Sequence, residues 1–118
     1  MNERWEIVYY QSPNQTTSPV SDFINSLSPD AKSKVIVVVD LLETYGTKVG
    51  LPHSKKLVGT ALWELRILGR DSIRILYITA VGKKFLMLHG FIKKKQKTEK
   101  KEIKTALTRL LEYNSRAK

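Results

Sequence analysis

The stretch "LWELRILGRDSIRILYITAVGKKFLMLHGFI" (residues 62–92) contains three apolar segments separated by two short polar ones. The apolar segments LWELRIL, SIRILYITA and KFLMLHGFI are rich in β-branched and aromatic residues, which favour strands. The GRD and VGK segments between them are long enough for tight turns but too short for a crossover connection. The stretch therefore predicts an antiparallel meander of three strands.

Further elements are predicted before the meander. RWEIVYYQ (residues 4–11) has strand composition. Two helices are expected next, because Ser18-Pro19 and Ser28-Pro29 each place an N-cap residue before a proline at the first helical position. The second helix is predicted from Pro29 to about Tyr45, and residues 46–61 are predicted to form a loop. The apolar stripe of this helix has helical spacing and consists of Val35, Val38, Val39 and Leu42.

A last helix is predicted from about Thr98 to Tyr113. The predicted order is β-α-α-β-β-β-α in one domain covering residues 1–118, an α+β fold with a mainly antiparallel sheet and helices packed on one of its faces.

Composition limits the classes of function. The chain has 118 residues, 42% of them hydrophobic and 27% charged, which is typical of a globular protein. It has no cysteine and two histidines, so disulfides, thiolate chemistry and zinc-type ligand spacing are excluded, and no cofactor or metal is expected. The sequence shows no signal-peptide pattern and no apolar run that could cross a bilayer, so a cytoplasmic protein is expected.

The net charge of +10 suggests a polyanionic partner such as nucleic acid, the ribosome, an acidic protein or a membrane surface. The most basic segment is HGFIKKKQKTEKKEI (residues 89–103), which carries six lysines. A solvated charge run is one interpretation of this segment. The like-charged pair Lys100 and Lys104, four residues apart on the predicted helix, favours the other, a surface that binds a nucleic-acid backbone.

Two arginines interrupt the apolar strands of the meander. If the GRD turn is centred on Arg70, Arg66 and Arg74 lie directly opposite each other on one sheet face. Such like charges repel, and either a salt bridge to Glu64 on the same face or a bound phosphate would relieve the repulsion. Both alternatives remain open from the sequence. Glu64 and Asp71 are otherwise expected to be surface or turn residues.

The segments LWELRI, SIRILYI and LMLHGFIKKKQKTEKKEIKTALTR together resemble the phage-related, HigB-like branch of the RelE/ParE toxin superfamily, over roughly residues 55–109. The LHGF-x-K-K pattern is the strongest single element. The resemblance implies a curved antiparallel sheet, metal-independent cleavage of messenger RNA in the ribosomal A site, and inhibition by a helix-turn-helix HigA-like antitoxin. Ribosomal RNA is an implied contact. The alternatives are a ParE-like DNA gyrase inhibitor on the same fold and a non-enzymatic nucleic-acid-binding module.

The resemblance also implies functional residues. Arg74 matches an arginine that contacts the scissile phosphate, and Arg66 matches a basic residue lining the same site. RelE itself has a functional tyrosine in its C-terminal segment, whereas the corresponding stretch here, KKKQKTEKKEI, contains none, and Tyr113 is the first tyrosine after it. His89 is either an acid or base beside Arg74 or a strand histidine packed near Phe91. The face that carries the two arginines is expected to be concave and less covered than the face that carries Trp63.

The predicted catalytic residues are Arg66, Arg74, His89, Lys93 and Lys94. The predicted RNA- or ribosome-binding residues are Lys55, Lys56, Lys95, Lys97, Lys100, Lys101 and Lys104.

Overall fold

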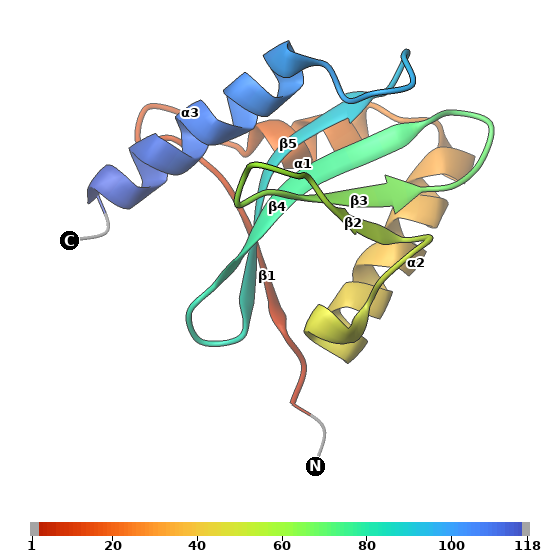
Figure 1. Cartoon of the computed structure of the whole chain (residues 1–118), viewed down its shortest axis with the longest axis horizontal. Coiled ribbons are helices and arrows are strands. Elements are labelled where there is room, and N and C mark those ends of the chain that lie inside the picture. The colour runs from red at the N-terminus through yellow and green to blue at the C-terminus, as the bar shows by residue number, and fades with distance from the viewer. Residues whose placement is uncertain (1–2, 117–118) are drawn as a thin grey trace.

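The computed structural model describes residues 3–116, whose strands form one five-stranded curved sheet in the order β1-β5-β4-β3-β2 (Figure 1). The α+β class is confirmed. In chain order the elements are β1 (Glu6–Tyr9), α1 (Pro19–Asn25), α2 (Pro29–Tyr45), the short 3-10 helix η1 (Gly46–Lys48), β2 (Ser54–Lys56), β3 (Trp63–Ile67), β4 (Ile73–Ala80), β5 (Lys84–Ile92) and α3 (Lys100–Arg116).

The predicted meander is confirmed: β3, β4 and β5 pair antiparallel in succession, and β1 pairs parallel with β5. The loop predicted for residues 46–61 is wrong in part, because it contains β2, which pairs antiparallel with β3. The strand β2 consists of three polar residues, and such a short segment has no alternating pattern that would predict a strand. The pairing with β3 determines their conformation, and the buried hydroxyl groups of Ser54 and Tyr77 lie 2.6 Å apart across the sheet.

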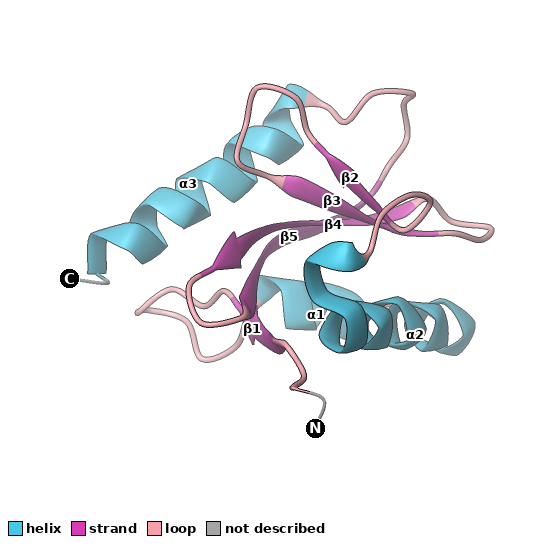
Figure 2. Ribbon diagram, turned by 60° about the horizontal axis from the view of Figure 1, so that its bottom comes forward, coloured by secondary structure: helices cyan, strands magenta, loops and turns pink. Residues whose placement is uncertain are grey.

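The helices cover both faces of the sheet, so the prediction that they pack on one face is wrong (Figure 2). Helices α1 and α2 pack on the face that carries Leu65 and Ile75, and α3 packs on the face that carries Leu62 and Leu76. Both alternating sets of strand residues are mainly apolar, so each face has to be covered to keep it from water.

The predicted helix starts are confirmed. Ser18 Oγ accepts hydrogen bonds from the backbone N–H groups at the start of α1, and Ser28 Oγ accepts one from Ala31 N at 3.2 Å. The predicted apolar stripe of α2 is buried in full. Within residues 3–116, no helix is both long enough and apolar enough to span a bilayer.

A register irregularity in β5 determines which face each residue of the LHGF pattern occupies. Tyr77 is opposite Met87, whereas the preceding Leu76 is opposite His89, so Leu88 is an extra residue. Leu88, His89 and Phe91 consequently lie on the α3 face, and Gly90 lies on the other. A Cβ atom on Gly90 would be 2.5 Å from Cδ2 of Phe23 in α1, so this position has no room for a larger residue.

Candidate functional site

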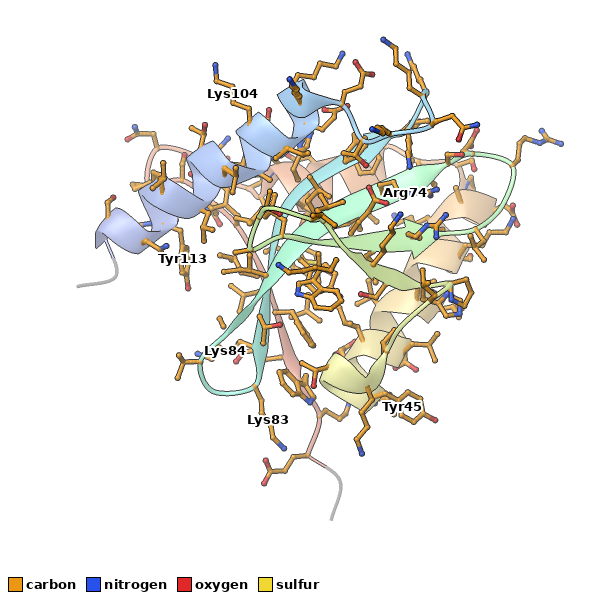
Figure 3. All side chains as sticks on the ribbon, viewed as in Figure 1. Tyr45, Arg74, Lys83, Lys84, Lys104 and Tyr113 are labelled. Carbon is orange, nitrogen blue, oxygen red and sulfur yellow. The ribbon has the colours of Figure 1, made fainter. Side chains whose placement is uncertain are left out.

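The two arginines of the meander lie directly opposite each other, as predicted, in the pairing of β3 with β4. Arg66 is half-buried, but Arg74 is only 7% exposed. The prediction that this face is the less covered one is therefore wrong around Arg74. Figure 3 shows Arg74 beside the loop that joins β5 to α3, and the Arg74 guanidinium donates a hydrogen bond to the carbonyl oxygen of Ile73 at 2.9 Å.

Glu64 is buried beside Arg74 and is 2% exposed, so the expectation of a surface or turn residue is wrong. Its Oε1 lies 3.5 Å from Arg74 Nε, and its Oε2 accepts a hydrogen bond from Thr98 Oγ1. The salt bridge considered from the sequence is thus present at Arg74. Thr98 comes from the loop after β5, so this bond also ties the lysine-rich segment to the sheet.

Positive charge nevertheless exceeds negative charge in the region around Glu64 and Arg74. Lys55 of β2 is directly opposite Glu64 in the sheet, and the backbone N–H of Lys93 bonds to the Ser72 carbonyl oxygen at 2.7 Å. Within residues 3–116, Arg66 Nε is buried without a hydrogen-bond partner. Arg74 is paired with Glu64, and the charges of Glu64, Arg74, Arg66 and Lys55 all act on Lys93, so Glu64 is the one carboxylate in this group of four cations among the described residues.

The cluster changes the acidity of its members. Burial lowers the pKa of Arg74, the charge of Glu64 opposes this effect, and the charge of Arg66 adds to it. Burial is also the largest cause of the lowered pKa of Lys93. Glu64 opposes the shift, and Arg74, Arg66 and Lys55 each lower that pKa further. Burial first, and then the neighbouring cations, thus lower the pKa of Lys93 and favour its neutral form.

A cavity of about 190 Å³ opens beside this cluster. Lys55 and Lys56 of β2 form one wall, and Lys93, Lys97 and Thr98 of the loop after β5 form another, with Glu64 also in the lining. Three of the lysines predicted to bind RNA thus meet a predicted catalytic lysine. The wall formed by β2 was not expected from the sequence.

His89 is directed to α3. Its Nε2 lies 2.9 Å from Glu102 Oε1, and its Nδ1 lies 3.3 Å from the Arg109 guanidinium. Because arginine can only donate, Nδ1 accepts and the ring proton is on Nε2. Burial lowers the pKa of His89; Glu102 opposes that shift. Phe91, on which His89 stacks with ring centroids 5.3 Å apart, is the residue opposite Arg74. The geometry supports the packing interpretation.

The remaining predicted lysines lie outside the cavity. Lys94 is exposed, and Lys95 is exposed with its Nζ 3.9 Å from Glu99. Lys100, Lys101 and Lys104 lie on exposed positions of α3, and Figure 3 shows Lys104 projecting away from the sheet. Tyr113 lies near the other end of α3 from the lysine-rich loop (Figure 3).

Sequence reasoning missed Thr98 and Arg109. Thr98 has no distinguishing signal, because its role depends on where the loop meets Glu64. Arg109 is positioned by the fold of α3 onto β5, where it also donates to the Leu88 carbonyl oxygen at 2.7 Å. Over residues 3–116, no three acidic or histidine side chains come close enough together to hold a metal ion.

Comparison with known proteins identifies the chain at the level of a family. The family described as "Phage derived protein Gp49-like (DUF891)" matches residues 22–111, and the comparison with curated proteins gave no match. This family belongs to the RelE/HigB-type toxin group, and it is commonly a toxin of toxin–antitoxin systems, which implies an antitoxin partner. The resemblance seen in the sequence is confirmed to that extent. Because the match covers most of the chain, the protein belongs to the phage-derived Gp49-like family.

Proposed function

We propose that the chain is a toxin that cleaves messenger RNA on the ribosome without a metal ion, with the cationic cavity as its active site. The observation that supports this proposal is the excess of positive charge near Lys93, where Arg66, Arg74 and Lys55 act on the lysine and Glu64 is the one carboxylate of the group among the described residues. Removing cations from water is costly unless they are paired, and a phosphodiester would supply the missing negative charge.

In the proposed reaction, the 2′-hydroxyl of one nucleotide attacks the adjacent phosphorus. The bond from the 2′-oxygen to phosphorus forms and the bond from phosphorus to the 5′-oxygen breaks, which gives a cyclic phosphate and a free 5′-hydroxyl. Arg66 and Arg74 stabilise the charge that develops on the phosphorane oxygens. Arginine hardly deprotonates, so it does not carry the proton.

Lys93 is the proposed proton carrier: its neutral amine takes the proton of the attacking 2′-hydroxyl, and the leaving 5′-oxygen takes up a proton from water. The pKa of Lys93 is lowered by burial and by three neighbouring cations, so a larger share of it is neutral near physiological pH than of an ordinary lysine. Glu64 acts in this proposal by holding Arg74 in place. His89 is assigned a packing role, because both ring nitrogens already face side chains of α3.

The proposed partners follow from the same assignment. Messenger RNA in the ribosomal A site is the substrate, and the exposed lysines Lys94, Lys95, Lys100, Lys101 and Lys104 contact ribosomal RNA through its phosphates. A helix-turn-helix antitoxin of the HigA type neutralises the toxin. Action on ribosomes places this activity in the cytoplasm.

The test is cleavage of messenger RNA on translating ribosomes by purified protein. Replacing Arg66 with alanine should lower the cleavage rate about 100–1000-fold, the usual effect of removing one donor that stabilises a developing oxyanion. Lys93→Ala should also lower the rate and should abolish the rising limb of the pH–rate profile that deprotonation of Lys93 produces. Lys84→Ala, at the far end of β5, is the control and should cleave at the wild-type rate.

Arg74 needs a second variant because its loss leaves Glu64 buried without a counter-charge. The double variant Arg74→Ala with Glu64→Gln removes the charge of both residues, and it should fold but not cleave. Wild-type cleavage by a folded Arg66→Ala or double variant would contradict the proposed site. Growth arrest with intact messenger RNA and altered DNA supercoiling would instead indicate a gyrase inhibitor.

A further inference from the structure

The turn between β2 and β3 holds an exposed valine at the edge of the cationic cavity. Val58 is 96% exposed, and it lines the cavity of about 190 Å³ together with Leu57. The rest of the lining consists of four lysines, Glu64 and Thr98. Figure 2 shows this turn beside the start of α3, which follows the lysine-rich loop. The cavity therefore combines an apolar contact surface with the cations proposed to bind phosphate.

Hydrogen bonds within the turn fix the position of Val58. Thr60 N donates to the Leu57 carbonyl oxygen at 3.2 Å, which closes a β-turn with Val58 and Gly59 at its centre. Gly59 has a φ of +83°, a left-handed conformation that glycine adopts without strain. Thr60 Oγ1 also donates to the Leu57 carbonyl oxygen at 2.9 Å and accepts from Leu62 N at 3.0 Å. Leu57 packs against the apolar cluster beneath α3, whereas the Val58 side chain stays exposed beside the cavity.

A second valine shows that exposure alone does not mark a binding site. Val81, in the turn between β4 and β5, is also 96% exposed. The lysines that follow it, Lys83 and Lys84, are each paired with an acidic side chain near the start of the chain. Val58 differs from Val81 because it shares a cavity with four lysines, so a ligand bound there would meet positive charge and an apolar group together.

We infer that Val58 contacts the base of a nucleotide whose phosphate lies among the lysines of this cavity. The inference rests on the proposed function, because it adds a base-binding subsite to the proposed RNA site. Proteins commonly bind single-stranded nucleic acid with cations along its backbone and with side chains that pack on the flat faces of its bases. The side chain of Val58 has no hydrogen-bonding group, so this contact by itself accepts any base.

The test compares a short 2′-O-methyl RNA strand with a strand of the same length that has sugars and phosphates but no bases. Fluorescence anisotropy measures the affinity for each, and wild-type protein should bind the strand with bases more tightly. Val58→Ser should weaken binding of that strand about 3–10-fold, because apolar contact area is lost, and should leave binding of the other unchanged. Val58→Tyr should bind the strand with bases several-fold more tightly, because an aromatic ring stacks on a base.

The matched controls are Val81→Ser and Val81→Tyr, because Val81 is exposed to the same extent in another turn. Both should bind the two strands like wild type, and circular dichroism checks the fold of every variant. The salt dependence of binding should be the same in Val58→Ser as in wild type, because the substitution removes no phosphate contact.

The outcomes separate this inference from the proposed function. Equal binding of the two strands by wild-type protein overturns the subsite, because only the charge of the strand is then recognised. Wild-type affinity in folded Val58→Ser and Val58→Tyr proteins, or equal changes in the Val81 variants, also overturns it. Binding that depends on Val58 in a chain that never cleaves messenger RNA on ribosomes supports the subsite and counts only against the proposed reaction. Cleavage by a chain that does not distinguish the two strands counts only against the subsite.

Discussion

Glu64 is buried among cations, and both of its carboxylate oxygens are engaged, one by Arg74 and one by Thr98. A buried ion pair seldom adds much stability compared with an apolar pair of the same size, but removing one partner leaves an uncompensated charge. Glu64 therefore stabilises the fold because it neutralises the buried charge of Arg74.

We expect Glu64→Leu to lower the free energy of unfolding by about 3–5 kcal/mol, because Arg74 then stays buried without its counter-charge. Adding Arg74→Met should restore most of this loss, since neither charge remains. Urea unfolding followed by circular dichroism measures both values. Lys34→Ala is the control, because its ion pair is exposed and should contribute less than about 1 kcal/mol. Additive losses in the double variant would show that the two side chains act independently.

The pH dependence of stability tests the placement of His89. Burial lowers the pKa of His89 in the folded protein below the ordinary value of 6.5, and Glu102 opposes this in part. The unfolded chain then binds the proton first, so stability is fully present above about pH 6.5 and is lost as the pH falls from there through the lower pKa of the folded protein, by at most about 1.4 kcal/mol per pH unit for one proton.

Urea unfolding at several values between about pH 7.5 and pH 5.5 should show this loss in the wild type and a smaller one in His89→Gln. Glutamine keeps a hydrogen-bonding side chain but does not titrate. Equal pH dependence in the two proteins would mean that His89 does not contribute to it.

At the residue level, the sequence predicts which strand residues lie opposite each other better than it predicts which side chains are buried. The Arg66–Arg74 pairing follows from the length of a local turn, so it could be predicted. The burial of Glu64 and Arg74 could not, because it depends on α3 and on the loop with Thr98, which come from a distant part of the chain. The face of His89 was undetermined for a related reason. The extra residue Leu88 shifts the alternation of β5, and no local pattern marks it.

At the scale of elements, the meander and the helix starts were predictable, whereas β2 was not. Ser and Pro residues mark the helix starts locally, and long apolar alternation marks the strands. The strand β2 has neither signal and depends on β3 for its pairing. The sequence also could not show which sheet face α3 covers, because an amphipathic helix can pack on either apolar face, and the structure places it on the face of Leu62 and Leu76.

The contact between α1 and β5 gives a prediction at this scale. Gly90→Ala should lower the free energy of unfolding by about 1–3 kcal/mol, because its Cβ would lie 2.5 Å from the Phe23 ring and α1 would have to move. Thermal unfolding measures the change, and adding Phe23→Leu should recover part of it. The matched control is Gly50→Ala, where no atom lies within 4 Å of the added Cβ. A Gly90→Ala protein as stable as Gly50→Ala would contradict the close contact.

Across the whole molecule, which has a net charge of +10, some lysines are already paired with carboxylates and others are free to bind an anion. At the turn between β4 and β5, Lys83 and Lys84 are paired with Glu3 and Glu6 at 3.3 and 4.0 Å. Figure 3 shows these two lysines at the end of the molecule away from Arg74. Beside the cavity, in contrast, Glu64 is the one carboxylate near Lys93, Arg66, Arg74 and Lys55 among the described residues. The basic composition predicted a polyanionic partner, but only the fold shows which lysines remain available to it.

This distribution predicts which lysines contribute to RNA binding. Each phosphate contact adds about 0.7 to the slope of log K against log salt for a single strand, through release of counterions. We expect Lys97→Ala, at the cavity, to reduce this slope by about that amount, and Lys83→Ala, which already has an acidic partner, to leave it unchanged. Fluorescence anisotropy with a 2′-O-methyl RNA strand, which cannot be cleaved through its 2′-oxygen, measures affinity between about 50 and 200 mM salt. If both variants reduce the slope equally, RNA responds to the total charge of the protein and the cavity has no special part in binding it.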